Sequence, residues 1–216
     1  MILCIEGLDC CGKATQSKML YENLKEEGFK LLSFPNYGTK GAILVESYLN
    51  GDYGKDASTI NPYQASTFFA MDRLHTYLTE MKPWIDQGGH FVLDRYATSN
   101  LLYQASKIKD KAERQKFNAW INDFEYEKLG IPKADVVFFL KVNYDTFINL
   151  MAERNDNKHR GNDIHEDNKN YLREVYDISY EVAVDNGWVI VDCDNGHGGL
   201  LSREEISNRI ISSLRK

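Results

Sequence analysis

The chain has 216 residues, of which 43% are hydrophobic and 27% are charged, and its formal net charge is −6. This composition is typical of one soluble globular domain with a sizeable core, and no apolar run is long enough to span a membrane. The negative charge argues against nucleic acid or an anionic membrane as the main partner, although a local basic site could still bind small anions.

The first part of the chain predicts a strand, a glycine-rich loop and a helix. Residues 1–6 are mostly apolar, Gly7 and Gly12 bracket four residues, Lys13 follows directly, and residues 16–27 have helical character. This order is the context of a phosphate-binding P-loop, in which backbone N–H groups, a helix N-terminus and a lysine surround phosphate oxygens. The residues predicted to bind ATP are Gly7, Leu8, Asp9, Cys10, Cys11, Gly12, Lys13, Ala14 and Thr15.

Two features of this loop are unusual. Ala14 stands where such loops usually carry the Ser or Thr that binds Mg²⁺, and Thr15 is the next hydroxyl. Cys10 and Cys11 lie side by side inside the loop. We interpret them as small side chains that fit there; the alternative is a thiol whose pKa is lowered by the helix N-terminus and which oxidises readily.

The four cysteines of the chain lack the spacing of a metal site or a disulfide framework. The N-terminal residues lack the basic segment and the cleavage site of a signal peptide. The simplest interpretation is a reduced, cytoplasmic protein.

The remaining chain alternates strands with helices. Asn61 and Pro62 are a good N-cap and first residue for a long helix, which Pro83 ends or kinks, and Ser202 with Glu205 forms a capping box. The predicted inner face of the long helix consists of Phe68, Met71, Leu74, Tyr77, Leu78 and Met81. In chain order, the predicted elements are strand 29–34, helix 42–49, helix 61–82, strand 90–94, helices 99–106 and 111–129, strand 135–140, helix 143–153, helix 166–186, strand 188–193 and a terminal helix.

This alternation predicts a single α/β domain over residues 1–216, with a central five-stranded parallel sheet between two layers of helices. Ligands of such sheets bind outside the carboxyl ends of the strands. The P-loop, the pair Asp94-Arg95 and the pair Phe34-Pro35 are all expected at that edge.

Three groups of residues there could carry chemistry. Asp94 could hold Mg²⁺ through water and Arg95 could fork onto a phosphate; the alternative is a salt-bridged strand end. Phe69 and Arg73 share one helix face and could stack on and hydrogen-bond a flat polar ring; the alternative is that Phe69 is a core residue.

The third group is the polar stretch 154–163, which contains Arg154, Lys158 and Arg160. Beside a P-loop it predicts a mobile lid, over about residues 154–166, that brings cations to the phosphates and excludes water. The alternative is a solvated surface loop. The five histidines show no metal-binding or catalytic spacing, so we expect them to be structural or exposed.

Taken in order, these residues resemble the thymidylate kinases, a family of P-loop nucleoside-monophosphate kinases, nearly from end to end. Five matches carry the resemblance: Glu6-Gly7-Leu8-Asp9-x-x-Gly12-Lys13-x-Thr15-Gln16; Phe34-Pro35-Asn36-Tyr37; Phe69-Ala70-x-Asp72-Arg73; Asp94-Arg95-Tyr96-x-x-Ser99-Asn100; and Asp163-x-x-Glu166 after a basic loop. The resemblance implies a P-loop kinase fold, transfer of the γ-phosphoryl of ATP to dTMP with Mg²⁺ as cofactor, and a homodimer.

The resemblance also implies roles for single residues. Phe69 would stack on thymine, with Arg73 on its O4 edge and Asn100 on the other side. Arg95 and Tyr37 would hold the dTMP phosphate, and Tyr103 would lie under the sugar. The implied substrate-binding residues are Asp9, Tyr37, Phe69, Arg73, Arg95, Ser99, Asn100, Tyr103 and Asp163, the implied catalytic residues are Lys13, Arg95, Asp9, Arg154 and Arg160, and the implied metal residues are Asp9 and Asp94, through water.

The chain also departs from the family pattern. Some members carry an arginine at the position of Cys10, so this chain resembles the type whose catalytic arginine lies in the lid, with Arg154 and Arg160 as candidates. His165 stands where relatives often have an aromatic residue. Two alternatives stay open: a kinase for dUMP, another pyrimidine monophosphate or a nucleoside, and a P-loop regulatory protein in which Ala14 marks lost catalysis.

Overall fold

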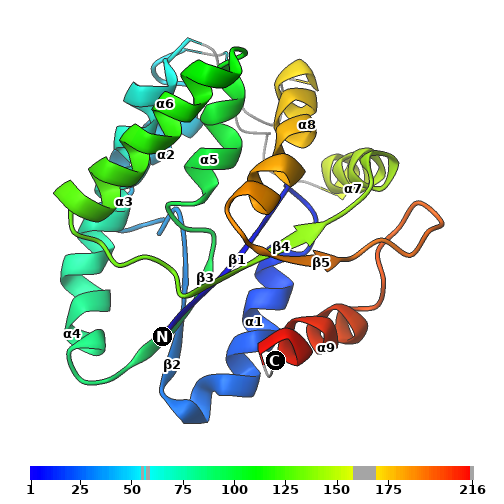
Figure 1. Ribbon diagram of the computed structural model, residues 1–216, viewed down its shortest axis with the longest axis horizontal. Coiled ribbons are helices and arrows are strands. Elements are labelled where there is room, and N and C mark those ends of the chain that lie inside the picture. Colours follow the sequence, from blue (N-terminus) through cyan, green and yellow to red (C-terminus); the bar gives the residue numbers. More distant parts are fainter. Residues whose placement is uncertain (55, 57–58, 158–168, 215–216) are drawn as a thin grey trace.

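The computed structural model describes residues 1–54, 56, 59–157 and 169–214. Its five strands form one parallel sheet in the order β2-β3-β1-β4-β5, which confirms the predicted α/β class (Figure 1). The strands are β1 Ile2–Gly7, β2 Phe29–Ser33, β3 His90–Asp94, β4 Val136–Lys141 and β5 Val189–Asp192. Because β1 lies in the middle, the P-loop that follows it opens at the centre of the carboxyl edge.

Helices lie on both sides of this sheet, and α1 and α9 pack side by side below the strands in Figure 1. The α-helices are α1 Lys13–Leu24, α2 Ile43–Leu49, α3 Pro62–Thr76, α4 Lys82–Ile85, α5 Ser99–Tyr103, α6 Lys111–Asn122, α7 Tyr144–Asn157, α8 Lys169–Asp185 and α9 Arg203–Leu214. The other helical turns are η1 Lys25–Glu27, η2 Tyr77–Met81, η3 Ala105–Lys107 and η4 Asp123–Lys128. No described helix combines the length and the apolar character needed to cross a bilayer.

The core lies on both faces of the sheet because successive strand residues point to opposite sides. In β1, Leu3 and Ile5 join the cluster that contains Leu20 of α1, whereas Ile2 and Cys4 join a second cluster. All six residues of β1 are buried, as expected for a central strand of a parallel sheet. The buried sheet therefore supports the loops that follow its strands and holds them in place.

Glycine is required at two positions of the P-loop. Gly12 has φ 93°, a left-handed conformation that other residues rarely adopt. A Cβ at Gly7 would lie 2.9 Å from Cys11 Sγ and 3.0 Å from the carbonyl oxygen of Leu140 on β4. The loop can turn back over the sheet only because Gly7 and Gly12 have no side chains.

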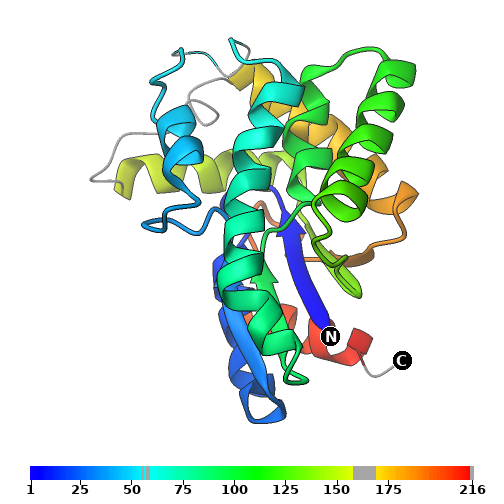
Figure 2. The same cartoon turned by 90° about the vertical axis from the view of Figure 1, so that its left-hand side faces the viewer.

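The predicted long helix is present, but both its end and its buried face differ from the prediction. Asn61 caps it, accepting a hydrogen bond of 2.9 Å from the Gln64 N–H. The helix does not end at Pro83: it widens into the π turn η2 and continues to Ile85, so that α3, η2 and α4 form one column in Figure 2. Pro83 has no N–H to donate, and it lies in the first turn after the π turn, where proline is tolerated.

The predicted inner face of this helix was partly wrong. Met81 is fully buried, but Leu78 is 57% exposed, and polar residues occupy much of the buried face. Asp72, Arg73 and Thr76 are all buried. Apolar periodicity could not reveal this face because its polar groups are bonded to other elements, Arg73 to Glu125 and Asp72 to the Asn36 N–H.

The other elements agree with their predictions to within a few residues, with one consequential difference. Helix α7 extends to Asn157, so Arg154 lies on a helix and not at the start of a lid loop. Residues 158–166 of the predicted lid lie outside the described residues. The capping box of α9 is confirmed, because Ser202 Oγ accepts from the Glu205 N–H and Glu205 Oε2 accepts from the Ser202 N–H.

Candidate active site

A cavity of about 430 Å³ opens at the carboxyl edge of the sheet, where the topology predicts a ligand. We call its two parts the loop end, formed by residues 9, 10 and 12–15 with Asp94, Arg95 and Arg154, and the helix end, formed by Phe69, Arg73 and Asn100. The predicted residues that line the cavity are Asp9, Cys10, Gly12, Lys13, Ala14, Thr15, Tyr37, Phe69, Arg73, Asp94, Arg95, Ser99, Asn100, Tyr103 and Arg154. Gly7, Leu8 and Cys11 are buried behind this surface.

Charges of opposite sign meet at the loop end. Asp9 Oδ1 accepts a hydrogen bond from Arg95 and lies 4.0 Å from Lys13 Nζ, and Asp9 Oδ2 accepts from Tyr103 Oη at 3.2 Å. Burial alone would raise the pKa of Asp9, but Arg95 and Lys13 outweigh it and lower the pKa to about 2. Asp9 is therefore an anion that holds two cations at the mouth of the P-loop.

Arg95 is presented to the cavity by a strained turn. Its φ is 67°, which is uncommon for a residue with a side chain. The turn is fixed by Glu6, a fully buried carboxylate that accepts from the Tyr96 N–H at 3.1 Å, from Thr98 Oγ1 at 2.7 Å and from Ser99 Oγ at 2.9 Å. Burial raises the pKa of Glu6, while nearby Arg95 opposes this rise. Ser99 thus donates its hydroxyl to Glu6 while lining the cavity.

Asp94 is the residue best suited to hold a cation. Its Oδ1 atom is buried without a hydrogen-bond partner among the described residues, and the side chain lines the cavity beside the P-loop. An unpartnered buried carboxylate oxygen is costly unless a cation or water satisfies it. No group of three or more metal-binding side chains occurs within the described ranges, so phosphate oxygens and water would have to complete the shell of Mg²⁺.

Arg154 reaches the loop end from helix α7. Its Nη1 lies 3.6 Å from Cys10 Sγ, and Met151 Sδ lies 3.4 Å from the same sulfur. Arg154 also contributes to the lowered pKa of Asp9. A guanidinium therefore stands beside the very position where the P-loop lacks an arginine. Burial raises the pKa of both Cys10 and Cys11, contrary to the alternative of an activated thiol.

The helix end is built around a buried ion pair. Arg73 donates from Nε and Nη2 to the two carboxylate oxygens of Glu125, each at 2.6 Å, and Asn100 Nδ2 donates to Glu125 Oε1 at 2.9 Å. Arg73 is 2% exposed and Glu125 is fully buried. Burial alone would lower the pKa of Arg73, but the Glu125 charge raises it. Three helical segments are thus joined at one carboxylate.

Phe69 forms the apolar wall of the helix end. It is half-buried, lines the cavity, and lies nearly perpendicular to the ring of Tyr48 of α2, with a centroid distance of 6.0 Å and an interplanar angle of 85°. An aromatic side chain at the surface of a cavity can stack on a flat base. Tyr37, on the loop after Pro35, lines the cavity and is 60% exposed. The neighbouring Asn36 N–H donates to Asp72 Oδ2 at 2.9 Å, which fixes that loop to α3.

The residues predicted from the sequence do not include Glu125, Gln104 or Leu49. Gln104 lines the cavity with its Oε1 atom buried and without a hydrogen-bond partner among the described residues, and Leu49 lines the same cavity. Gln104 follows Asn100 by one helical turn, a spacing that could have drawn attention to it. Nothing in the sequence marks Glu125. Arg160, Asp163, Glu166 and His165 lie outside the described residues, so the predictions for them stay predictions.

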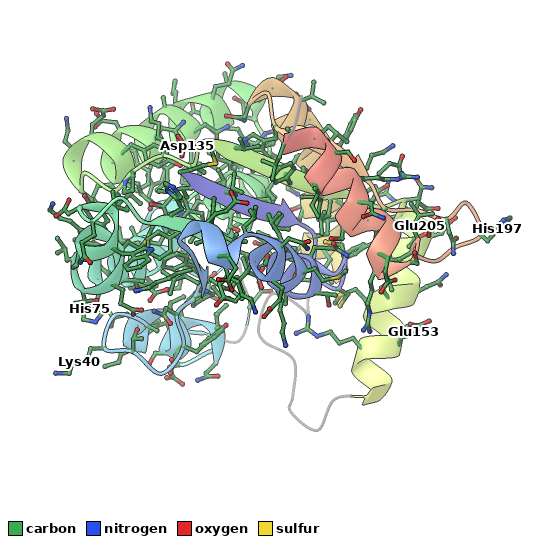
Figure 3. The ribbon with its side chains drawn as sticks, turned by 90° about the horizontal axis from the view of Figure 1, so that it is seen from below. Lys40, His75, Asp135, Glu153, His197 and Glu205 are labelled. Carbon is green, nitrogen blue, oxygen red and sulfur yellow. The ribbon has the colours of Figure 1, made fainter. Side chains whose placement is uncertain are left out.

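The described histidines stand apart from the site. His75 and His197 project on opposite sides of the molecule (Figure 3), and His90 Nδ1 lies 2.8 Å from the N-terminal nitrogen. No described histidine lines the cavity.

Comparisons with known proteins agree on one family. The family model described as thymidylate kinase matches residues 5–200. The thymidylate kinase of Mycobacterium tuberculosis is 33% identical over 149 residues, which cover 66% of each chain, and that of Brachyspira hyodysenteriae is 31% identical over 81% of this chain and 76% of its own. Among solved structures, the thymidylate kinase from Candida albicans shares the fold with a TM-score of 0.68 and 22% identity, over 99% of this chain and 90% of its own. The thymidylate kinase from Ehrlichia chaffeensis shares it with a TM-score of 0.64 and 20% identity, over 99% of this chain and 98% of its own.

Proposed function

Because the chain belongs to the thymidylate kinase family, we propose that it transfers the γ-phosphoryl group of ATP to the phosphate of dTMP, giving dTDP and ADP. The observation that carries this proposal is the pairing of a P-loop with a second cation, Arg95, and with a buried polar slot at Phe69, Arg73 and Asn100, all around one cavity. Donor phosphates, acceptor phosphate and a flat base each have a matching surface.

The reaction is an in-line displacement at the γ-phosphorus. The acceptor phosphate is already an anion, so little general-base catalysis is needed, and the protein supplies positioning and neutralisation of charge. Lys13 and the loop N–H groups hold the ATP phosphates. Arg95 holds the acceptor phosphate, assisted by Tyr37, and exchanges part of its contact with Asp9 for phosphate oxygens.

Arg154 is the cation that we assign to the charge developing during transfer. Its position beside Cys10 and Asp9 supports this choice, since it places a guanidinium at the P-loop. Arg160 remains a second candidate by sequence. Asp163 and Glu166 remain predicted contacts at the end of the lid.

Mg²⁺ fits the loop end through Asp94. When bound, the ion would neutralise the β- and γ-phosphate oxygens and align them for transfer. Ala14 supplies no hydroxyl ligand, so we propose that the Asp94 carboxylate would hold the hydrated ion instead. Asp9 is engaged by Arg95 and Tyr103 and contributes mainly as a fixed negative charge.

The helix end holds the nucleoside. Phe69 stacks on thymine, Arg73 donates to O4 and Asn100 contacts N3, while Tyr103 lies under the sugar. The Tyr103 hydroxyl donates to Asp9 Oδ2 at 3.2 Å, which ties the tyrosine to the loop end.

We also propose that the chain acts as a homodimer in the cytoplasm, without nucleic acid. Large apolar side chains on α2, Ile43 and Leu44, are exposed and suit a protein contact. All four cysteines are free thiols, as expected in a reducing compartment. Light scattering at micromolar concentration tests the dimer, and a mass of 24.9 kDa would contradict it.

The test of the proposed function is an ADP-release assay with ATP, Mg²⁺ and a panel of dTMP, dUMP, dCMP and thymidine. We expect dTMP to give the highest kcat/KM. A higher value for thymidine or dCMP would contradict the proposal. Tight ATP binding without ADP release in the presence of dTMP would instead support a regulatory protein.

A further inference from the structure

The polarity of the hydrogen bonds at the helix end is set by Glu125. Its carboxylate can only accept hydrogen bonds, and it accepts three: two from Arg73 and one from Asn100. Oxygen and nitrogen of a side-chain amide are normally assigned from their partners. Here the assignment is forced, because only Nδ2 of Asn100 can donate to a carboxylate oxygen.

This constraint fixes what Asn100 and Arg73 offer to the cavity. With Nδ2 directed to Glu125, Asn100 has its acceptor, Oδ1, left for a ligand. With Nε and Nη2 of Arg73 forked onto Glu125, Nη1 is the remaining edge, and it can only donate. Neither Oδ1 of Asn100 nor Nη1 of Arg73 has a hydrogen-bond partner among the residues that the structure describes. The slot therefore offers one donor and one acceptor side by side.

Thymine and uracil present the complementary pair, an O4 acceptor beside an N3–H donor. Cytosine presents the opposite pair, an N4 amino donor beside an unprotonated N3 acceptor. We propose that Glu125 is a positioning residue that makes the site select thymine or uracil against cytosine, by locking Asn100 and Arg73 in the polarity that cytosine cannot satisfy. This inference rests on the proposed function and goes beyond it, because it assigns base selection to a residue that does not line the cavity.

The magnitude of the effect follows from burial. A site built to hydrogen-bond a substrate rejects an analogue with mismatched groups by roughly 10⁴–10⁵, because buried polar groups are left unpaired. Arg73, Asn100 and Glu125 are all buried, so water cannot repair a mismatch at this slot. Rotation of the Asn100 amide would remove the mismatch at N3, but it would set Oδ1 against the Glu125 carboxylate.

The experiment compares dTMP with 5-methyl-dCMP, two nucleotides that share the methyl group and differ only at positions 3 and 4. We expect the wild-type protein to prefer dTMP by at least 10³ in kcat/KM. In Glu125→Gln, either orientation of the amide sets its nitrogen against an N–H of Arg73, because Arg73 donates to both Oε1 and Oε2, so the arrangement that holds Arg73 and Asn100 is broken. The preference for dTMP should then fall at least tenfold, and the KM for ATP should not change.

A rescue variant separates polarity from structure. The double variant Glu125→Gln with Asn100→Asp moves the carboxylate from one position to the other, and a carboxylate at position 100 again offers an acceptor to N3–H. It should recover most of the preference for dTMP. Glu127→Gln, an exposed residue of the same π turn, is the matched control and should leave the preference unchanged.

Each outcome decides the inference. A preference unchanged in Glu125→Gln, or no rescue in the double variant, overturns it and leaves Glu125 as a structural residue. A wild-type protein that uses dTMP and 5-methyl-dCMP equally well overturns it even if Glu125→Gln does not fold. A wild-type protein that releases no ADP with dTMP contradicts the proposed function itself, and the inference fails with it.

Discussion

The two ends of the cavity bind charge in opposite ways. Arg95 at the loop end is paired with Asp9 but keeps 20% of its side chain exposed, whereas Arg73 at the helix end is paired with Glu125 and is 2% exposed. An accessible ion pair can exchange one partner for a ligand at a small cost in free energy. A buried ion pair cannot separate without leaving a buried charge unpaired. The loop end is thus arranged for exchange and the helix end for fixed orientation.

The difference predicts that losses at the loop end appear in the rate of transfer. Lys13→Met should show the largest effect, lowering kcat roughly 10³–10⁵-fold, by comparison with cations that stabilise phosphoryl transfer. Lys13 is buried and donates to the Leu8 carbonyl, so the melting temperature should be measured alongside kcat to separate loss of transfer from loss of folding. Steady-state kinetics with Lys18→Met, an exposed residue of the same helix, as control check this result. A fall in kcat below tenfold would contradict the assignment.

Arg154→Ala should give the next largest effect, roughly 10²–10³ in kcat with a smaller change in KM for dTMP. Arg154→Lys should recover only part of it, because an ammonium keeps the charge but not the planar fork. Single-turnover measurements separate this effect from product release. An unaffected single-turnover rate in Arg154→Ala would transfer the proposed role to Arg160.

Asp94→Asn tests how Mg²⁺ is held without a hydroxyl at position 14. Loss of the carboxylate charge should raise the Mg²⁺ concentration needed for half-maximal activity by about tenfold, while saturating Mg²⁺ should restore much of the rate. Restoring the hydroxyl in the double variant Ala14→Ser with Asp94→Asn should lower that requirement again. A Mg²⁺ dependence identical to the wild type would show that Asp94 does not hold the ion.

The last prediction concerns stability and not the rate of transfer. The pKa of Asp9 is lowered to about 2, so this carboxylate stabilises the folded state above its unfolded pKa of about 4, and the contribution disappears as the pH falls towards 2. Wild type should exceed Asp9→Asn in free energy of unfolding by about 2 kcal/mol at pH 6. Urea unfolding from pH 6 to pH 2 should show this difference shrinking. A difference that is constant with pH would contradict the assigned cause.

The comparison of the two ends also explains what could be predicted from the sequence. The loop end comes from consecutive residues whose chemistry and spacing are visible in the chain, so Gly7 to Thr15 and Asp94-Arg95 could be placed on the strands that precede them. The helix end depends on Glu125, which is 52 positions from Arg73 and 25 from Asn100. No local pattern reveals that an acidic residue in a polar helix is buried.

Two errors have the same origin. The run from Arg154 onward is polar, and a polar run without an apolar face can still be helical, so α7 continues to Asn157 beyond its predicted end. Leu78 matched the apolar repeat of the long helix, yet it is exposed, since the π turn that follows Thr76 changes the residues facing the core. Periodicity fails where a helix contains more than one kind of turn.

Glu125 lies in a π turn, so the direction of its side chain depends on the number of residues in the helix before it. If Glu125 sets base selection, helix length affects base selection as well. In η4, the Leu129 N–H donates to the Phe124 carbonyl at 2.9 Å, five residues back, so this turn contains one residue more than an α-helical turn. Each residue advances an α-helix by about 100°. Deleting a single residue between Lys111 and Phe124 would therefore rotate residue 125 away from Arg73 unless the π turn shifted to compensate. Homologues that differ in length within this segment would then need a different way to fix Arg73 and Asn100, and natural insertions should be confined to the loop before α6.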